Sequence, residues 1–212
     1  MYLIGNGRLV SSDPERPYFE RGAVVTEGDR ILEEGEYAAL AQKYPRSEFI
    51  DPNGGLIMPA FINVHSHIYS ALARGLSING YAPANFLEIL EGMWWAIDRQ
   101  LDEESTLCSA YATIIDGIRT GCTTIFDHHA GYGWIEGSLS TIAKAVKELG
   151  VRACLCYEVS DRDGAKKRDA AIRENGDFIT SCRKEKDPML AAMFGGHALL
   201  TLSDETLDDM VK

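Results

Sequence analysis

The stretch GLIMPAFINVHSH, residues 55–67, decides the fold. It reads as a buried apolar strand that follows a Pro-Asn-Gly turn sequence, and it ends in two histidines separated by one residue. Because side chains alternate between the two faces of a strand, His65 and His67 point the same way and Ser66 points the other way. Two imidazole rings that converge on one point suit a Zn²⁺ or Fe²⁺ ion. The stretch therefore predicts part of a metal site at the end of a strand.

Strands and helices alternate along the chain after residue 102. Apolar periodicity predicts helices and strands over 103–120, 122–126, 138–149, 151–157, 165–184 and 190–194, and Ser203 caps a last helix. Such alternation indicates βαβ units and a parallel sheet. Polar side chains follow the strands: Asp127, His128, His129, Glu158, Asp161 and His197. This register is typical of a (β/α) barrel, and no glycine-rich phosphate fingerprint supports an open doubly wound sheet instead.

The first 85 residues have other patterns. Short apolar runs at 2–4, 8–10, 23–26 and 31–32 predict pieces of a small antiparallel sheet that needs further strands to close its core. Residues 68–81 have no clear period, which is typical of a functional loop. A helical pattern then includes Trp94, for which we predict core packing, with an aromatic wall for a planar substrate as the alternative.

The composition is that of a globular protein. The chain has 212 residues, of which 45% are hydrophobic and 25% charged, and five cysteines without a CxxC pattern fit reduced thiols. The net charge of −11 counts against a nucleic-acid duplex as partner, because phosphate-backbone binding needs a basic surface. No apolar run approaches the length of a membrane span and the N-terminus lacks a signal-peptide pattern, so we expect a cytoplasmic protein without a membrane partner.

Residues 58–67 resemble the first-strand signature of the amidohydrolase superfamily of metal-dependent hydrolases. Four further stretches resemble the aminohydrolase branch of this superfamily: ALARG at 71–75, GCTT at 121–124, DHH at 127–129 and GHA at 196–198. That branch holds chlorohydrolases, guanine deaminases and S-adenosylhomocysteine deaminases. Residues 68–80 are most similar to SsnA-type aminohydrolases. The resemblance implies a (β/α)8 TIM barrel, of which 56–212 hold about strands 1–5 and stop in the helix after strand 5. It also implies a β-sandwich to which residues 1–55 contribute.

The resemblance implies a metal site made of His65, His67 and His197, the first two from strand 1 and the third from strand 5. It implies one divalent ion, Zn²⁺ first and Fe²⁺ as the alternative, because strand 4 lacks the lysine that bridges two metals in hydantoinase-like members. Either His128 or His129 could face the substrate. Glu158, after strand 4, either supports a ligand histidine or caps a loop. The candidates for the substrate pocket are Arg74, Trp94, His128, His129 and Glu158.

The implied activity is hydrolysis of a carbon–nitrogen bond in a small purine- or pyrimidine-like heterocycle by a metal-activated water. Dechlorination and cyclic amide hydrolysis are alternatives within the family. The family's proton-transferring glutamate and water-orienting aspartate are expected beyond residue 212. We therefore expect an N-terminal fragment that is inactive alone and that is completed by a missing C-terminal part or is homo-oligomeric.

Two hypotheses from other classes remain open. The chain could be a non-catalytic binding or assembly module that docks through an open sheet edge. It could also be a (β/α) phosphoesterase, although the absence of basic residues beside the histidines counts against phosphate substrates.

Overall fold

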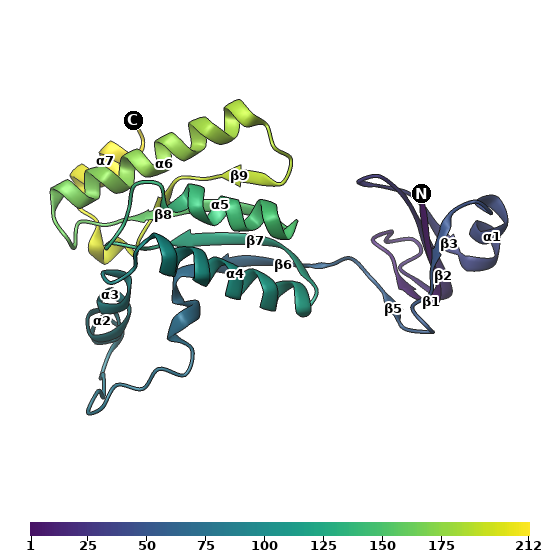
Figure 1. Ribbon diagram of the computed structural model, residues 1–212, viewed down its shortest axis with the longest axis horizontal. Coiled ribbons are helices and arrows are strands. Elements are labelled where there is room, and N and C mark those ends of the chain that lie inside the picture. The colour runs from purple at the N-terminus through teal and green to yellow at the C-terminus, as the bar shows by residue number, and fades with distance from the viewer. The chain divides into compact units, whose positions relative to one another are not determined.

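The computed structural model describes residues 1–212 as two units, Met1–Ala60 and Phe61–Lys212 (Figure 1). The division falls a few residues after the predicted one at 55/56. The reason is that Leu56–Ile57 pair with the first strand of the chain and so belong to the first unit. None of the helices combines the length and the apolar character that a membrane crossing needs.

The first unit is a five-stranded sheet with one short helix. Its strands are β1 (Tyr2–Val10), β2 (Tyr18–Glu27), β3 (Arg30–Glu36), β4 (Glu48–Ile50) and β5 (Leu56–Ile57). β1, β2 and β3 pair antiparallel as predicted, whereas β4 and β5 run parallel to β1. The helix α1 (Tyr37–Lys43) packs Leu40 against Leu3, Ala23 and Val25, which close a small core.

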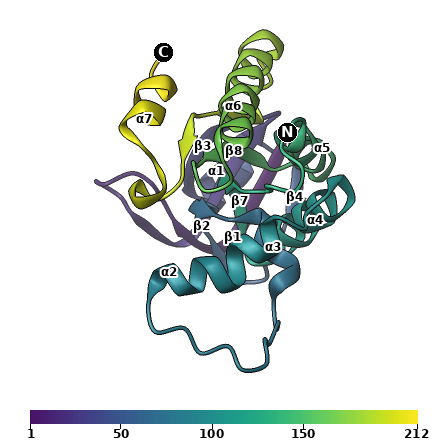
Figure 2. The same cartoon turned by 90° about the vertical axis from the view of Figure 1, so that its left-hand side faces the viewer.

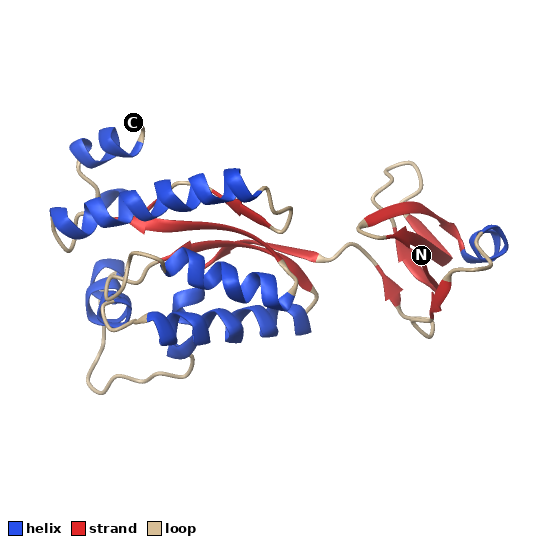
Figure 3. Cartoon of the chain, turned by 45° about the horizontal axis from the view of Figure 1, so that its top comes forward, coloured by secondary structure: helices blue, strands red, loops and turns tan.

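The second unit alternates parallel strands with helices. Its strands are β6 (Phe61–Ser66), β7 (Cys122–His129), β8 (Arg152–Val159), β9 (Leu190–Ala192) and β10 (Gly195–Gly196), and its longer helices are α4 (Glu103–Arg119), α5 (Ser138–Leu149), α6 (Ala165–Glu185) and α7 (Asp204–Met210). All strand pairs are parallel, in the order β10-β8-β7-β6 with β9 beside β8. Figure 3 shows the long helices lying along these strands. The predicted βαβ alternation is confirmed, and it is that of part of a (β/α) barrel.

Shorter helical segments follow β6 and β10. They are the 3₁₀ helices η1 (Ile68–Ala73) and η3 (Leu199–Thr201), and a continuous helix made of α2 (Phe86–Ile89), the π-helical turn η2 (Leu90–Trp94) and α3 (Trp95–Asp98). We call this continuous segment the 86–98 helix. In Figure 2 the connection from η1 to α2 loops away from the helices. The segment 68–81, for which the sequence shows no period, thus contains a 3₁₀ helix followed by a loop.

Helix α5 shows how the core of the second unit forms. Leu139, Ile142 and Val146 recur at three- and four-residue spacing and are fully buried. Gly150 ends the helix in the left-handed conformation, at φ 70°. The N-terminus of α5 has no capping side chain of its own, and Glu174 of α6 accepts hydrogen bonds from backbone N–H groups of its first turn at 2.7 and 2.9 Å. Two helices far apart in sequence are thereby fixed to each other.

β6 corrects the prediction of one buried strand over 55–67. The chain leaves β5 at Ile57 and re-enters a sheet only at Phe61, since Pro59 has no backbone N–H to donate. β6 pairs with β7 alone, and its side chains Phe61, Ile62 and Val64 are 58, 59 and 69% exposed. An apolar run on both faces predicts burial, but a strand at a sheet edge with one neighbour leaves that surface open.

Candidate functional site

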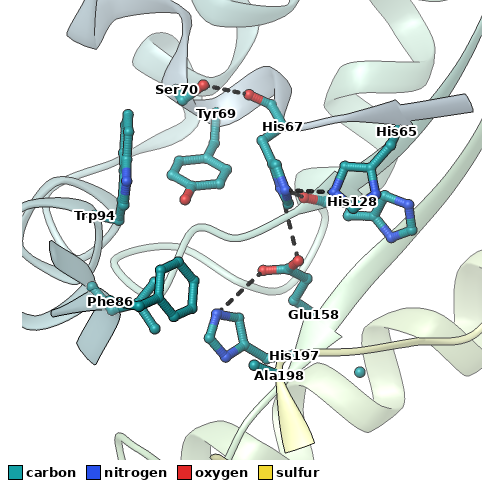
Figure 4. A pocket seen from close by; sticks show the side chains of 12 residues that line it. His65, His67, Tyr69, Ser70, Phe86, Trp94, His128, Glu158, His197 and Ala198 are labelled. Atoms are coloured by element: carbon teal, nitrogen blue, oxygen red, sulfur yellow. Dashed lines mark hydrogen bonds and ion pairs between the residues drawn. The ribbon is translucent and has the colours of Figure 1, made fainter. Parts of the chain in front are cut away.

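A cavity of about 580 Å³ lies at the carboxyl ends of the parallel strands, and its lining forms two walls (Figure 4). The polar wall consists of His65, His67, His128, Glu158 and His197. The aromatic wall consists of Tyr69, Phe86, Leu90 and Trp94. Figure 4 shows the rings of the aromatic wall facing the carboxyl and imidazole groups across the cavity. Of the polar side chains predicted to cluster after the strands, the five of the polar wall line the cavity, whereas Asp127, His129 and Asp161 do not.

His65 and His67 leave β6 on the same face, with their Nε2 atoms 3.0 Å apart. His67 Nδ1 lies 3.0 Å from the backbone carbonyl oxygen of His128. Because a carbonyl oxygen only accepts, Nδ1–H donates and the lone pair of neutral His67 is on Nε2. The short contact is then a hydrogen bond in which His65 Nε2–H donates to His67 Nε2. A metal ion shared by both rings would take the place of this proton.

His197 enters the same cavity from the segment after β10. Its Nδ1 lies 2.9 Å from the hydroxyl oxygen of Thr201, and that hydroxyl donates to the backbone carbonyl of Ala198 at 2.8 Å. The Thr201 oxygen therefore accepts from His197 Nδ1–H, which leaves the lone pair on Nε2. Nε2 faces the cavity, 4.0 Å from Glu158 Oε2. Thr201 thus selects the tautomer of His197 that can bind a metal.

Glu158 lies between His67 and His197. Its Oε1 is 3.8 Å from His67 Nδ1 and its Oε2 is 4.0 Å from His197 Nε2. Burial, followed by the nearby Asp127, raises the pKa of Glu158 to about 8. Burial lowers the pKa of His67, and burial together with Arg162 lowers the pKa of His197 to about 4. In the metal-free chain, burial thus favours the neutral form of the carboxyl and of both rings, and neutral imidazole is the form that binds metals.

The fit to a metal rests on the chemistry of these nitrogen donors. Neutral imidazole suits Zn²⁺ and Fe²⁺. As the side chains stand, no three His, Cys, Asp or Glu residues form a complete metal site. His65 and His67 form a two-nitrogen pair, and His197 presents its free Nε2 to the same cavity from the other side of Glu158. The residues fit one ion held by the pair, with His197 in reach of the cavity as a third donor.

Of the two adjacent histidines on β7, His128 lines the cavity and His129 does not. The ring of His129 is fully buried between Tyr69 and Tyr157, with ring centroids 6.4 and 5.5 Å away. Neither ring nitrogen of His129 has a hydrogen-bond partner, and burial lowers its pKa to about 3. Alternation along the strand places His128 on the site face and His129 in the core.

The two other residues that the sequence suggests for the substrate pocket, Trp94 and Arg74, differ in whether they line the cavity. Trp94 lines the cavity. Arg74 does not line it, because its side chain is 70% exposed and pairs with Asp116 of α4 at 2.6 Å. Arg74 borders a neighbouring hollow that also touches His65 and His67.

The sequence did not identify most of the aromatic wall. Phe86 and Tyr69 line the cavity, but Tyr69 belongs to a segment without periodicity. The π-helical turn at Leu90–Trp94 is a local widening that often accompanies functional sites, and it directs Leu90 and Trp94 to the same cavity. The role of Thr201 was also not predicted, although a hydroxyl residue four positions after His197 could have suggested a hydrogen bond to the ring of that histidine.

Known proteins support the fold. The sequence model of the amidohydrolase family matches residues 56–212. Among solved structures, atrazine chlorohydrolase TrzN from Arthrobacter aurescens TC1, complexed with zinc, superposes with a TM-score of 0.76 at 19% identity, over 99% of this chain and 49% of that one. E. coli guanine deaminase gives a TM-score of 0.77 at 18% identity, over 99% of this chain and 50% of that one.

A related sequence extends the comparison. The 5-methylthioadenosine/S-adenosylhomocysteine deaminase of Thermococcus sibiricus is 28% identical over 207 residues, which cover 97% of this chain and 44% of that protein. The chain thus spans about half the length of the proteins it matches. Since the family model covers most of the sequence, this chain belongs to the amidohydrolase family.

Proposed function

We propose that this chain carries the histidine part of a metal-dependent aminohydrolase site that acts on a carbon–nitrogen bond of a planar purine- or pyrimidine-like heterocycle. One observation carries the proposal: the imidazole rings of His65, His67 and His197 face an aromatic wall across one cavity (Figure 4). The matching Thermococcus sibiricus protein and the E. coli structure are both deaminases, which supports amino-group removal ahead of dechlorination.

The polar wall is suited to hold one divalent ion. His65 and His67 would be its first two ligands and His197 its third, and zinc is the first choice because the related TrzN structure contains it. The bound ion supplies a water of lowered pKa, which is the nucleophile for hydrolysis. The His128 carbonyl and the Thr201 hydroxyl keep the ring protons on the Nδ1 atoms, away from the cavity.

Glu158 and the aromatic wall are suited to bind the heterocycle. Burial raises the pKa of the Glu158 carboxyl in the metal-free chain, and a carboxyl in its neutral form can donate a hydrogen bond to a ring nitrogen. Tyr69 and Trp94 meet edge to face at 6.4 Å, and Phe86 is 60% exposed and has apolar surface left to bury. Flat apolar rings of this kind recognise planar bases by stacking, which contributes about 1–3 kcal/mol per base.

We propose further that this chain binds metal and heterocycle without turnover. Hydrolysis of an amine needs groups that orient the water and carry a proton to the leaving amine. Glu158 is the one carboxyl that lines the cavity, and it lies between two of the proposed ligands. A second group for these steps is not among the lining residues.

The test combines metal analysis, ligand binding and an ammonia assay on the purified chain. We expect one zinc per chain, binding of adenine, guanine or cytosine that depends on zinc, and no ammonia release from the matching nucleosides and bases. Ammonia release would overturn the proposed lack of turnover. If the chain bound no zinc, or if it bound none of these bases, the aminohydrolase proposal would be overturned.

The edge of the sheet favours a second candidate function. Phe61, Ile62 and Val64 are exposed on β6, whose outer backbone edge has no partner strand. Such an edge suits a binding or assembly module. Sedimentation with metal analysis separates the two: a monomer with one zinc supports the aminohydrolase, and a metal-free oligomer supports the module.

A further inference from the structure

Two neighbouring ion pairs join the end of the 86–98 helix to the loop after β8. Arg162 Nη2 donates to Asp98 Oδ2 at 2.5 Å, and Arg99 donates to both carboxylate oxygens of Asp163 at 2.7–3.1 Å. Asp98-Arg99 and Arg162-Asp163 lie opposite each other with their charges in reversed order, so each arginine faces an aspartate. We call these four residues the clasp.

The inner pair of the clasp is buried. The side chains of Asp98 and Arg162 are 1 and 4% exposed, whereas Arg99 is 37% exposed. Nε and Nη1 of Arg162 have no hydrogen-bond partner. The guanidinium instead lies over the ring of Tyr132 at 4.0 Å and over the ring of Trp95 at 5.1 Å. A buried cation between two ring faces and a carboxylate is fixed in position on three sides.

The 86–98 helix has few other attachments. None of the residues 74–89 is buried, and within the helix only Leu90, Trp95 and Asp98 are. Its last residue, Asp98, is held by Arg162 and by the backbone N–H of Gly133, which donates to the Asp98 carbonyl at 3.1 Å. The position of Phe86, Leu90 and Trp94 over the cavity therefore depends on the contacts at the end of the helix.

Trp95 connects the clasp to both walls of the cavity. It is 8% exposed and lies directly after Trp94 of the aromatic wall. Its ring also meets the ring of His197 edge to face, with centroids 6.1 Å apart. A shift of Arg162 releases one face of Trp95, and through it both Trp94 and His197 lose a fixed neighbour.

We propose that Arg162 is a positioning residue that holds the 86–98 helix, with its part of the aromatic wall, over the cavity and His197 in place for metal binding. Arg162 does not line the cavity and so acts through Trp95 and Asp98. What the cavity binds rests on the proposed function, whereas the mechanical role of the clasp does not.

The test compares Arg162→Met with Arg173→Met, which makes the same substitution in an exposed ion pair between Arg173 and Glu136 at 3.3 Å. Amide hydrogen exchange is measured on the metal-free chain. We expect exchange of residues 86–98 to be about tenfold faster in Arg162→Met and unchanged in Arg173→Met, with β7 and β8 unchanged in both. Wild-type exchange of residues 86–98 in folded Arg162→Met would overturn the proposal.

A gentler variant decides the matter if Arg162→Met does not fold. Arg162→Lys keeps the charge and the contact with Asp98 but removes the planar group between the rings. We expect exchange of residues 86–98 to be about threefold faster, with the rest of the chain as in wild type. Exchange equal to wild type throughout the helix would overturn the proposal.

A second readout tests the effect on His197, which a purely structural role would leave unchanged. Zinc affinity is measured by competition with a chelator in the folded variants. We expect it to be about tenfold weaker in Arg162→Lys and unchanged in Arg173→Met. Unchanged zinc affinity with faster exchange would overturn the positioning of His197. If wild type takes up no zinc, the proposed function fails, and the exchange data still decide the role of the clasp.

Discussion

The two walls of the cavity are built in different ways. The polar wall stands on strand ends, where the His128 carbonyl orients the ring of His67 and the Thr201 hydroxyl orients the ring of His197. Most of the aromatic wall comes from the 86–98 helix, which buries only Leu90, Trp95 and Asp98 and is held at its end by the clasp, whereas Tyr69 comes from η1, which is joined to the main core through Ile68. The rings proposed to bind metal are thus fixed by hydrogen bonds to neighbouring groups, and most of the surface proposed to recognise the substrate lies on a segment with few buried residues, which can adapt.

This contrast predicts that changes at His65, His67 and His197 alter metal binding and that changes in the aromatic wall alter ligand binding alone. The largest effect is expected for His67→Ala, which removes one of the paired nitrogens and should abolish zinc uptake. His128→Ala is the matched control, because it removes a ring from the same wall and keeps the carbonyl that orients His67. Equilibrium dialysis measures both variants. Equal loss of zinc in the two would contradict the assignment.

The next effect concerns the tautomer of His197. Thr201→Val keeps the shape of the side chain and removes the oxygen that accepts from Nδ1–H. Loss of such a supporting hydrogen bond should weaken zinc binding by about 10–100-fold. Thr180→Val on α6 removes a similar hydroxyl, which donates to the Gly176 carbonyl, and should leave zinc affinity unchanged. Full affinity in Thr201→Val would show that Thr201 does not support the site.

A smaller effect, on the pH dependence of stability, is expected from His129, which is buried behind the polar wall. Burial lowers its pKa to about 3 in the folded chain, whereas the unfolded chain takes up a proton near pH 6.5. The unfolded state therefore binds more protons below pH 6.5, and the stability that His129 contributes at neutral pH is lost progressively as the pH falls toward 3. Between pH 7.5 and 5 this loss amounts to ~2 kcal/mol.

Urea unfolding of the metal-free chain at these two pH values tests the prediction. In His129→Leu, which has no titratable group, the loss should be smaller than in wild type by that amount. An identical pH dependence in the two proteins would place His129 in contact with solvent or with an unrecognised partner. It would thereby remove the distinction between His128 in the cavity and His129 in the core.

The smallest effect is expected in the aromatic wall. Phe86→Leu keeps apolar volume and removes the flat ring, so the affinity for a planar base should fall about fivefold while zinc affinity stays the same. Phe194→Leu is the control, since Phe194 is partly exposed and does not line the cavity. Both affinities are measured by equilibrium dialysis on the same samples. A parallel loss of zinc in Phe86→Leu would show that the two walls are not independent.

Local patterns in the sequence were enough to predict much of the fold. The spacing of Ile142, Val146 and Leu149 predicts a helix over 138–149, the residues that form α5, because helical periodicity is a property of neighbouring residues. The facing of His65 and His67 follows from strand alternation in the same way.

Features that depend on distant residues could not be predicted. Burial of β6 was predicted wrongly, because an apolar run does not reveal that its strand lies at a sheet edge. Asp98 and Arg162 are 64 residues apart, and no local period connects them. The choice between His128 and His129 required the orientation of β7 in the sheet, which two adjacent histidines in the sequence do not reveal.

The central claim is that the paired imidazoles of β6 bind a single metal ion. X-ray absorption at the zinc edge of the zinc-loaded chain tests it most directly. The account predicts one zinc per chain, coordinated by imidazole nitrogens at about 2.0–2.1 Å and by no sulfur. A sulfur shell near 2.3 Å, which would point to Cys156 beside His128, or a zinc environment without imidazole would contradict it.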